Sequence, residues 1–139
     1  YEKNLRMTRH EVREELKQQE GDPQVRARVR SLQRELAQKR MMEDVGQADV
    51  VVTNPTHVAV ALRYLPEESA APVVVAKGQR LIAEKIKDLA RLAGVPLVEN
   101  KPLARALFKA VRIGDEIPEE LFKAVAEVLA CVFQLRRKA

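Results

Sequence analysis

Four consecutive residues, Asn54, Pro55, Thr56 and His57, have the greatest chemical potential in this chain. After most asparagines, the next backbone N–H can attack the side chain and cause deamidation, but Pro55 has no N–H. The remaining intramolecular reaction is attack by the side-chain amide nitrogen of Asn54 on its own carbonyl carbon. This attack closes a succinimide, expels the nitrogen of Pro55 and cuts the backbone between Asn54 and Pro55.

Such a cut needs assistance, because an amide nitrogen is a weak nucleophile and a peptide nitrogen is a poor leaving group. A tight turn can hold the Asn54 side chain near its own carbonyl, and a twist of the Asn54–Pro55 amide weakens its resonance. His57 is a candidate proton relay, because histidine exchanges protons near neutral pH. Thr56 is expected to shape the turn. The alternative is an ordinary turn, since Asn-Pro commonly begins one and such bonds are generally stable.

Other chemical motifs are absent from the sequence. The five glycines are too scattered for a phosphate-binding loop, and neither a GxSxG nor an HExxH pattern occurs. One cysteine, with His10 and His57 far apart, cannot complete a tetrahedral zinc site or an internal disulfide. We therefore expect no cofactor, no metal and a reducing compartment. The Lys77-Gly78 pair is interpreted as a turn between a strand and a helix rather than an anion site.

Short β-branched and apolar runs surround the four residues and predict a sheet. Strands are expected at residues 49–53 and 58–64, with Asn54 to His57 as the turn between them, and at 72–76 and 95–99. A helix between the last two strands is expected to end at Gly94, and a shorter helix begins at Pro102. These elements predict a small α/β domain with a mixed four-stranded sheet covered by helices.

The last predicted helix begins at Pro118 and has the broadest apolar face of the chain. Cys131 lies among its apolar residues and is expected in the core. One residue per turn forms the centre of this face: Leu121, Val125, Val128, Val132 and Leu135. Phe122, Leu129 and Phe133 widen it.

Residues 1–44 are richer in charge and poorer in apolar side chains than residues 45–139, which predicts a charged helical linker before a compact domain. Residues 1–20 form at most a marginal helix. A second helix is expected to begin with Asp22 as N-cap and Pro23 at its first position, and to continue to about Met42. Its narrow apolar stripe needs a partner surface and consists of Val25, Val29, Leu32 and Leu36.

Length and charge limit the remaining possibilities. The 139 residues fit one domain, and no apolar run is long enough to cross a bilayer, so we expect this chain to be soluble. A net charge of +5 suggests nucleic acid or an anionic membrane surface as a partner. Acids and bases are interspersed, however, and aromatic residues are few, which disfavours nucleic acid. The start at Tyr1 rather than Met suggests a piece of a longer protein.

The sequence around the four residues resembles the self-cleaving segment of the FlhB/YscU/SpaS family of type III export switch proteins. The last matching segment is more similar to the flagellar branch of the family. The segments that carry the resemblance are 50–64 (VVVTNPTHVAVALRY), 72–78 (PVVVAKG), 98–107 (VENKPLARAL) and 117–129 (IPEELFKAVAEVL).

The resemblance implies a domain that follows a membrane domain of four helices, lies at the cytoplasmic face of the bacterial inner membrane and cuts itself once. Asn54 would be the cyclising residue, Pro55 the leaving amine, and Thr56 and His57 supporting residues. The two fragments would stay associated. No turnover enzyme activity is expected, and the membrane would be contacted only through the missing N-terminal domain.

The same resemblance implies a role in flagellum biogenesis and protein export. Cleavage would switch export from rod and hook proteins to filament proteins, so the expected partners are these substrates, a ruler protein that sets hook length and other export components. Two alternatives remain. One is a binding module of an injectisome export apparatus whose turn never cuts, and the other is a basic nucleic-acid-binding domain.

Overall fold

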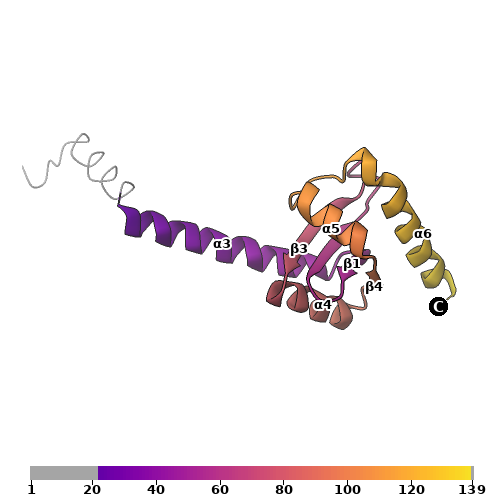
Figure 1. Cartoon of the computed structure of the whole chain (residues 1–139), viewed down its shortest axis with the longest axis horizontal. Helices are drawn as coiled ribbons and strands as arrows, with labels where there is room; N and C mark the ends of the chain where they lie inside the picture. The colour runs from indigo at the N-terminus through magenta and orange to yellow at the C-terminus, as the bar shows by residue number, and fades with distance from the viewer. Residues whose placement is uncertain (1–21, 139) are drawn as a thin grey trace, which may run out of the picture. The chain divides into compact units, whose positions relative to one another are not determined.

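The computed structural model describes the backbone of residues 22–138 (Figure 1). The chain divides into two units, Tyr1–Gln38 and Lys39–Ala139. The marginal helix predicted for residues 1–20 lies outside the described residues. Among the described helices, none combines the length and the apolar character needed to cross a membrane.

Helix α3 spans Pro23–Val45 and begins as its sequence predicts. The backbone N–H of Gln24 donates to the Asp22 carboxylate at 2.9 Å, so Asp22 caps the helix and Pro23 occupies its first position. Met41 and Val45, in the last turns, are buried, so these turns pack as part of the second unit. The functional division into a linker and a self-cleaving domain stays a prediction. The predicted apolar stripe is exposed at Val25, Val29, Leu32 and Leu36.

The sheet has four strands in the order β3-β2-β1-β4 and is mixed, which confirms the predicted fold class. Strands β1 and β2 are antiparallel, as are β2 and β3, whereas β4 runs parallel to β1. Because β1 lies between β2 and β4, it is an interior strand. The bounds are β1 Val50–Asn54, β2 Val58–Arg63, β3 Val73–Gln79 and β4 Leu97–Glu99.

Three α-helices and one 3-10 turn follow the first three strands. Helix α4 ends at Gly94, whose φ of 75° is the left-handed conformation predicted for this glycine. Helix α5 is capped by the Asn100 side chain, which accepts from the N–H of Leu103. The bounds are α4 Leu81–Ala93, α5 Lys101–Ala110, the 3-10 turn Glu119–Leu121 and α6 Phe122–Lys138.

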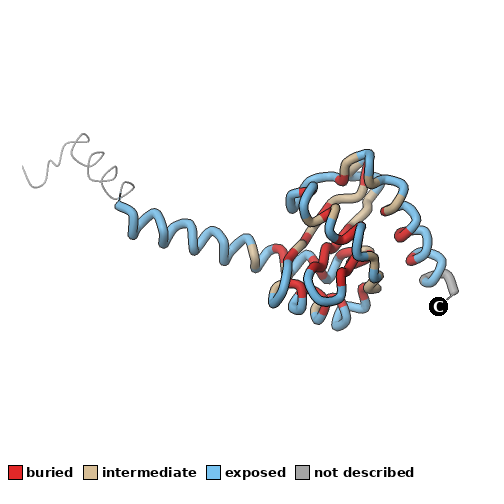
Figure 2. The backbone as a smooth tube through the Cα atoms, viewed as in Figure 1, coloured by how far each residue is buried: buried red, intermediate tan, exposed pale blue. Residues whose placement is uncertain are grey.

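Apolar clusters cover both faces of the sheet, and the alternation of β1 divides its side chains between them. Figure 2 shows that buried residues lie along the strands and on the helices around them. Val50 and Val52 pack with buried residues of α5 and α6. Val51 packs on the opposite face with residues of α4 and the end of α3. The largest fully buried side chains are Val45, Val50, Val51, Val52, Val60, Leu62, Val74, Ile86, Leu107, Val125 and Val132.

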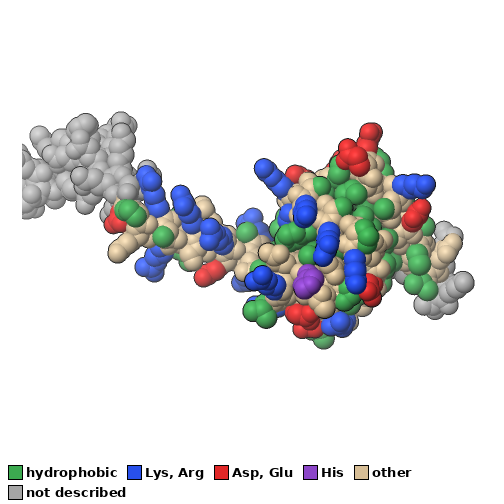
Figure 3. Space-filling model, viewed as in Figure 1, with side chains coloured by type: hydrophobic (Ala, Val, Ile, Leu, Met, Phe, Trp, Pro, Cys, Tyr) green, Lys and Arg blue, Asp and Glu red, His purple; other side chains and the backbone are tan. Residues whose placement is uncertain are grey.

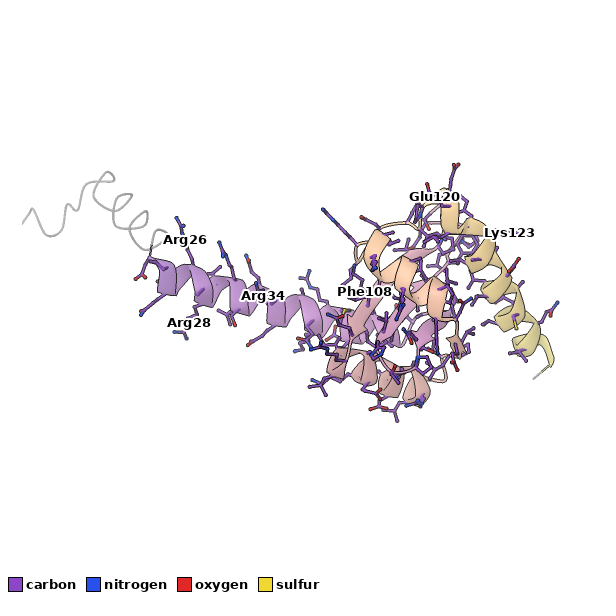
Figure 4. All side chains as sticks on the ribbon, viewed as in Figure 1. Arg26, Arg28, Arg34, Phe108, Glu120 and Lys123 are labelled. Carbon is purple, nitrogen blue, oxygen red and sulfur yellow. The ribbon has the colours of Figure 1, made fainter. Side chains whose placement is uncertain are left out.

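The predicted turn at Lys77 and Gly78 is wrong. Lys77 and Gly78 do not form a turn, because β3 continues through both to Gln79. A Cβ on Gly78 would lie 2.8 Å from the Cβ of Ile82, so this glycine allows α4 to approach the strand closely. The Lys77 ammonium instead donates to the carbonyls of Phe108 and Val111 at 2.9 and 2.8 Å, and lies 5.0 Å from the centre of the Phe108 ring. Phe108 belongs to α5 (Figure 4).

The apolar face of the last helix is narrower than predicted. Val125, Val128, Leu129 and Val132 are buried, but Phe122, Phe133 and Leu135 are exposed. Cys131 is also exposed, which contradicts its assignment to the core. The helix begins at Phe122 after the 3-10 turn rather than at Pro118.

Candidate functional site

The four candidate residues join β1 to β2 at one end of the sheet. Asn54 is the last residue of β1 and pairs with Val58, the first residue of β2, so Pro55, Thr56 and His57 form the connecting loop. Asn54 is only 3% exposed, whereas the three loop residues are exposed. The structure therefore holds the predicted nucleophile, Asn54, inside the sheet. The residues after the predicted cut, which include the predicted leaving residue Pro55, are exposed to solvent.

The loop is closed by a hydrogen bond to the carbonyl of the predicted cleavage site. The backbone N–H of His57 donates to the carbonyl oxygen of Asn54 at 3.0 Å. This bond polarises the carbonyl carbon that the side-chain amide of Asn54 would attack. It also directs a donor at the oxygen on which negative charge develops during that attack.

The loop lacks the backbone conformation that commonly closes a three-residue hairpin. Such loops usually combine a type I turn with a following residue in the left-handed region. Among the described non-glycine residues, positive φ occurs at Arg80, which is outside the loop. Pro55, Thr56 and His57 therefore all have negative φ, and contacts from outside the loop contribute to its shape.

Helix α4 supplies two of these outside contacts. The Lys87 ammonium donates to the carbonyl oxygen of Pro55 at 2.9 Å, and the backbone N–H of Arg80, just before α4, donates to the carbonyl of His57 at 3.1 Å. Lys87 is only 7% exposed and forms an ion pair with Glu84 at 2.7 Å. The hydrogen bond and the charge of Lys87 lower the pKa of Glu84 below its ordinary value.

The strand that ends in Asn54 is fixed on its other side by the segment around β4. The backbone N–H of Asn100 donates to the carbonyl of Thr53 at 2.9 Å, and the N–H of Val51 donates to the carbonyl of Pro96 at the same distance. Because β1 is bonded along both edges, the position of Asn54 is set by an interior strand rather than by a free loop.

The structure brings all four predicted site residues together, with two differences from the sequence interpretation. Asn54 is the last residue of strand β1 as well as the first residue of the turn that the His57 N–H closes. The hydrogen bond that His57 makes to the site comes from its backbone N–H, whereas its side chain points to an exposed position. The described residues contain no group of three His, Cys, Asp or Glu side chains placed to hold a metal ion.

Sequence reasoning missed the contact from Lys87, although its position carries a signal. Ala83, Ile86 and Ala90 are buried on α4, and helical spacing places Lys87 on the same face. A lysine within an otherwise apolar stripe needs a polar partner when it is buried. The two alanines leave room on this face for its longer side chain.

Charged side chains of both signs are mixed over the face shown in Figure 3. On α3, Arg26 and Arg28 project from different sides of the helix, as residues two positions apart must (Figure 4). The arginines of this helix therefore do not all line one face.

Comparison with known proteins identifies the class to which this fold and site belong. Residues 1–132 match the model of the FlhB, HrpN, YscU and SpaS family, so the chain belongs to that family. It is 54% identical over 135 residues to the flagellar biosynthetic protein FlhB of Salmonella typhimurium, covering 97% of this chain and 35% of the relative. It is 47% identical over 138 residues to FlhB of Bacillus subtilis, covering 99% of this chain and 38% of the relative. The chain thus spans little more than a third of these curated relatives.

Solved structures agree with this assignment. The cytoplasmic domain of FlhB from Shewanella putrefaciens is 50% identical with a TM-score of 0.70, over 73% of this chain and 78% of that one. An EscU C-terminal domain with an asparagine replaced by alanine is 34% identical with a TM-score of 0.64, over 66% of this chain and 92% of that one. These findings confirm the family resemblance and the fold predicted from the sequence.

Proposed function

We propose that this chain is the cytoplasmic part of a flagellar type III export protein and that it cuts itself between Asn54 and Pro55. Family membership and identity to flagellar FlhB proteins support the role in flagellum biogenesis and protein export. The EscU domains similar to this chain include variants of one asparagine and of the proline that follows it, which draws attention to the same dipeptide.

The observation that carries the proposal is the arrangement around the Asn54 carbonyl. In the proposed reaction, the side-chain nitrogen of Asn54 forms a bond to the Asn54 carbonyl carbon, and the bond from that carbon to the nitrogen of Pro55 breaks. One proton of the side-chain amide moves to the Pro55 nitrogen, which leaves as a secondary amine, and the other remains on the succinimide. The His57 N–H, 3.0 Å from the carbonyl oxygen, stabilises the negative charge of the tetrahedral intermediate.

The supporting residues have distinct parts in this proposal. Thr56 occupies the third position of the turn and sets its shape. The exposed His57 side chain relays a proton to the leaving nitrogen, so His57→Ala is expected to slow the cut rather than abolish it. Pro55→Ala restores an N–H and changes the turn, which favours deamidation over cleavage.

Cleavage separates the two fragments covalently but leaves the sheet intact. Five residue pairs join β1 to β2 and three join β1 to β4, and both partner strands lie in the second fragment. The fragments therefore stay associated while the three loop residues are freed to rearrange. In the proposed switch, this new loop surface permits export to change from rod and hook proteins to filament proteins.

The same proposal gives the surroundings of the domain. A membrane-embedded part precedes it in the whole protein and holds it at the cytoplasmic face of the bacterial inner membrane. Its partners are export substrates, a hook-length ruler protein and other components of the export apparatus. No nucleic acid takes part.

Intact-protein mass spectrometry of freshly purified, denatured chain tests the cleavage. We expect two fragments, one ending at Asn54 and the other beginning at Pro55. The first fragment should initially be lighter by one water than the hydrolysed fragment, because it ends in a succinimide. Asn54→Ala removes the nucleophile and should give one uncut mass with an unchanged fold. An uncut wild-type chain after long incubation would instead leave a binding module of the same fold, and cleavage of Asn54→Ala would exclude the cyclisation mechanism.

A further inference from the structure

Lys87 contacts the cleavage turn from a helix that is itself firmly packed. Ala83, Ile86 and Ala90, on the same face of α4, are 0–3% exposed and belong to the apolar cluster beneath the sheet. The lysine stem follows this face, and its ammonium reaches the Pro55 carbonyl at 2.9 Å. Any movement of that carbonyl must therefore break a charge-assisted hydrogen bond to a nearly buried amine.

The bonded carbonyl is the one whose orientation decides the type of turn. In a four-residue turn over Asn54 to His57, the central peptide joins Pro55 to Thr56. Type I and type II turns differ by a flip of this central peptide, and type II requires positive φ at the third residue. Thr56 does not have positive φ, so the turn is not type II, and Lys87 donates to the Pro55 carbonyl in the orientation found here.

The hydrogen bond to the reactive carbonyl does not by itself fix this peptide. Type I and type II turns both keep the bond from the fourth N–H, here that of His57, to the first carbonyl, here that of Asn54. The Lys87 bond does constrain the peptide, and it acts on Pro55, the residue whose nitrogen leaves in the proposed cut. This bond anchors the leaving residue to α4, while the interior strand β1 holds Asn54 on the other side of the scissile bond.

We propose that Lys87 is a positioning residue for the self-cleavage at Asn54-Pro55, acting through its hydrogen bond to the Pro55 carbonyl. The inference rests on the proposed function. Lys87 does not touch the reacting carbon or nitrogen. It anchors the leaving residue, Pro55, to α4 while the Asn54 carbonyl accepts from the His57 N–H.

Lys77 provides a matched control. It is also a lysine of the same domain whose ammonium donates to backbone carbonyls, those of Phe108 and Val111, but these carbonyls lie at the end of α5. Replacing either lysine by methionine keeps most of the side-chain length and removes the charge and the donors. Lys87→Arg retains a charged donor at the turn.

The rate is measured by pulse labelling of newly made chain in cell-free synthesis, followed by a chase on gels. Met7, Met41 and Met42 all precede Asn54, so the label reports both the uncut chain and the first fragment. We expect Lys87→Met to slow cleavage by about 10- to 100-fold, as small misplacements of reacting groups do. Lys77→Met should cut at the wild-type rate, and Lys87→Arg should recover most of the lost rate.

Thermal melts of both methionine variants in the uncut Asn54→Ala background show whether the fold is retained. Wild-type cleavage rates for Lys87→Met would overturn the positioning role, provided that the parent chain cuts and Asn54→Ala does not. Equal slowing by Lys87→Met and Lys77→Met would also overturn it, because the effect would then follow from general destabilisation. A parent chain that never cuts would refute the proposed function itself.

Discussion

Cleavage at Asn54-Pro55 should make the thermal stability of this domain depend on its concentration. The first fragment ends with β1, which lies between two strands of the second fragment. Separation leaves the second fragment without its interior strand and exposes Val50, Val51 and Val52 of the first fragment, which are fully buried in the folded domain. Unfolding of the cut domain is therefore also its dissociation, and dilution favours the dissociated state.

The size of the effect follows from the size of the compact unit, Lys39–Ala139. Each tenfold dilution favours the separated fragments by about 1.4 kcal/mol. A domain of about 100 residues unfolds with an entropy near 0.2 kcal/mol/K, so the midpoint should fall by about 7 °C per tenfold dilution. Over a hundredfold range the expected fall is about 14 °C.

Far-UV circular dichroism melts of fully cut protein at three concentrations measure this shift. The uncut Asn54→Ala chain is the control, and its midpoint should not change, because its unfolding releases one chain. A midpoint of the cut domain that is independent of concentration would show that the fragments separate and unfold in different steps. That result would refute the reasoning from the interior position of β1.

Three further predictions concern residues away from the cleavage turn. Gly78→Ala should destabilise the domain by about 1–3 kcal/mol in urea titrations, because the new methyl group overlaps Ile82. Gly46→Ala should leave the free energy of unfolding nearly unchanged, because its Cβ would meet nothing closer than 3.7 Å. Equal losses of unfolding free energy in the two variants would contradict the packing argument. The pKa of Glu84 is lowered in the folded state, so its ion pair with Lys87 stabilises the fold above about pH 4.5. This stabilisation is lost as the pH falls through the lowered pKa. Glu84→Gln should therefore lower the urea midpoint at neutral pH but not under acid conditions. A difference between the variant and wild-type midpoints that persists in acid would show that the ion pair is not its cause. Cys131 should react with iodoacetamide in the native protein, and protection until denaturation would contradict its exposure.

The local elements of this fold were accessible from the sequence because their signals are local. The N-cap at Asp22 and the left-handed Gly94 each depend on one residue and its immediate neighbours. The strands on either side of Asn54-Pro55 follow from β-branched runs that are buried on both faces.

What was missed depends on how the elements pack against one another. Gly78 looks like a turn residue until α4 is seen against it, and Lys87 looks like a solvated lysine until the loop is folded above it. Cys131 lies on an apolar helix, but only the part of the helix that meets the sheet is buried, and its periodicity alone does not give the width of that contact. The chemistry proposed at Asn54 follows from the covalent structure of the Asn-Pro pair, whereas the contacts that Lys87 and Arg80 make to the turn do not.

Because β1 is an interior strand, neither fragment is expected to persist without the other after the proposed cut. A lone second fragment would expose the inner edges of β2 and β4, and a lone first fragment would expose both edges of β1 and its valines. Unpaired apolar edges invite aggregation and proteolytic degradation. If the chain cuts itself as proposed, each fragment would cover the exposed strand edges of the other, and a single cut would produce the two in equal numbers.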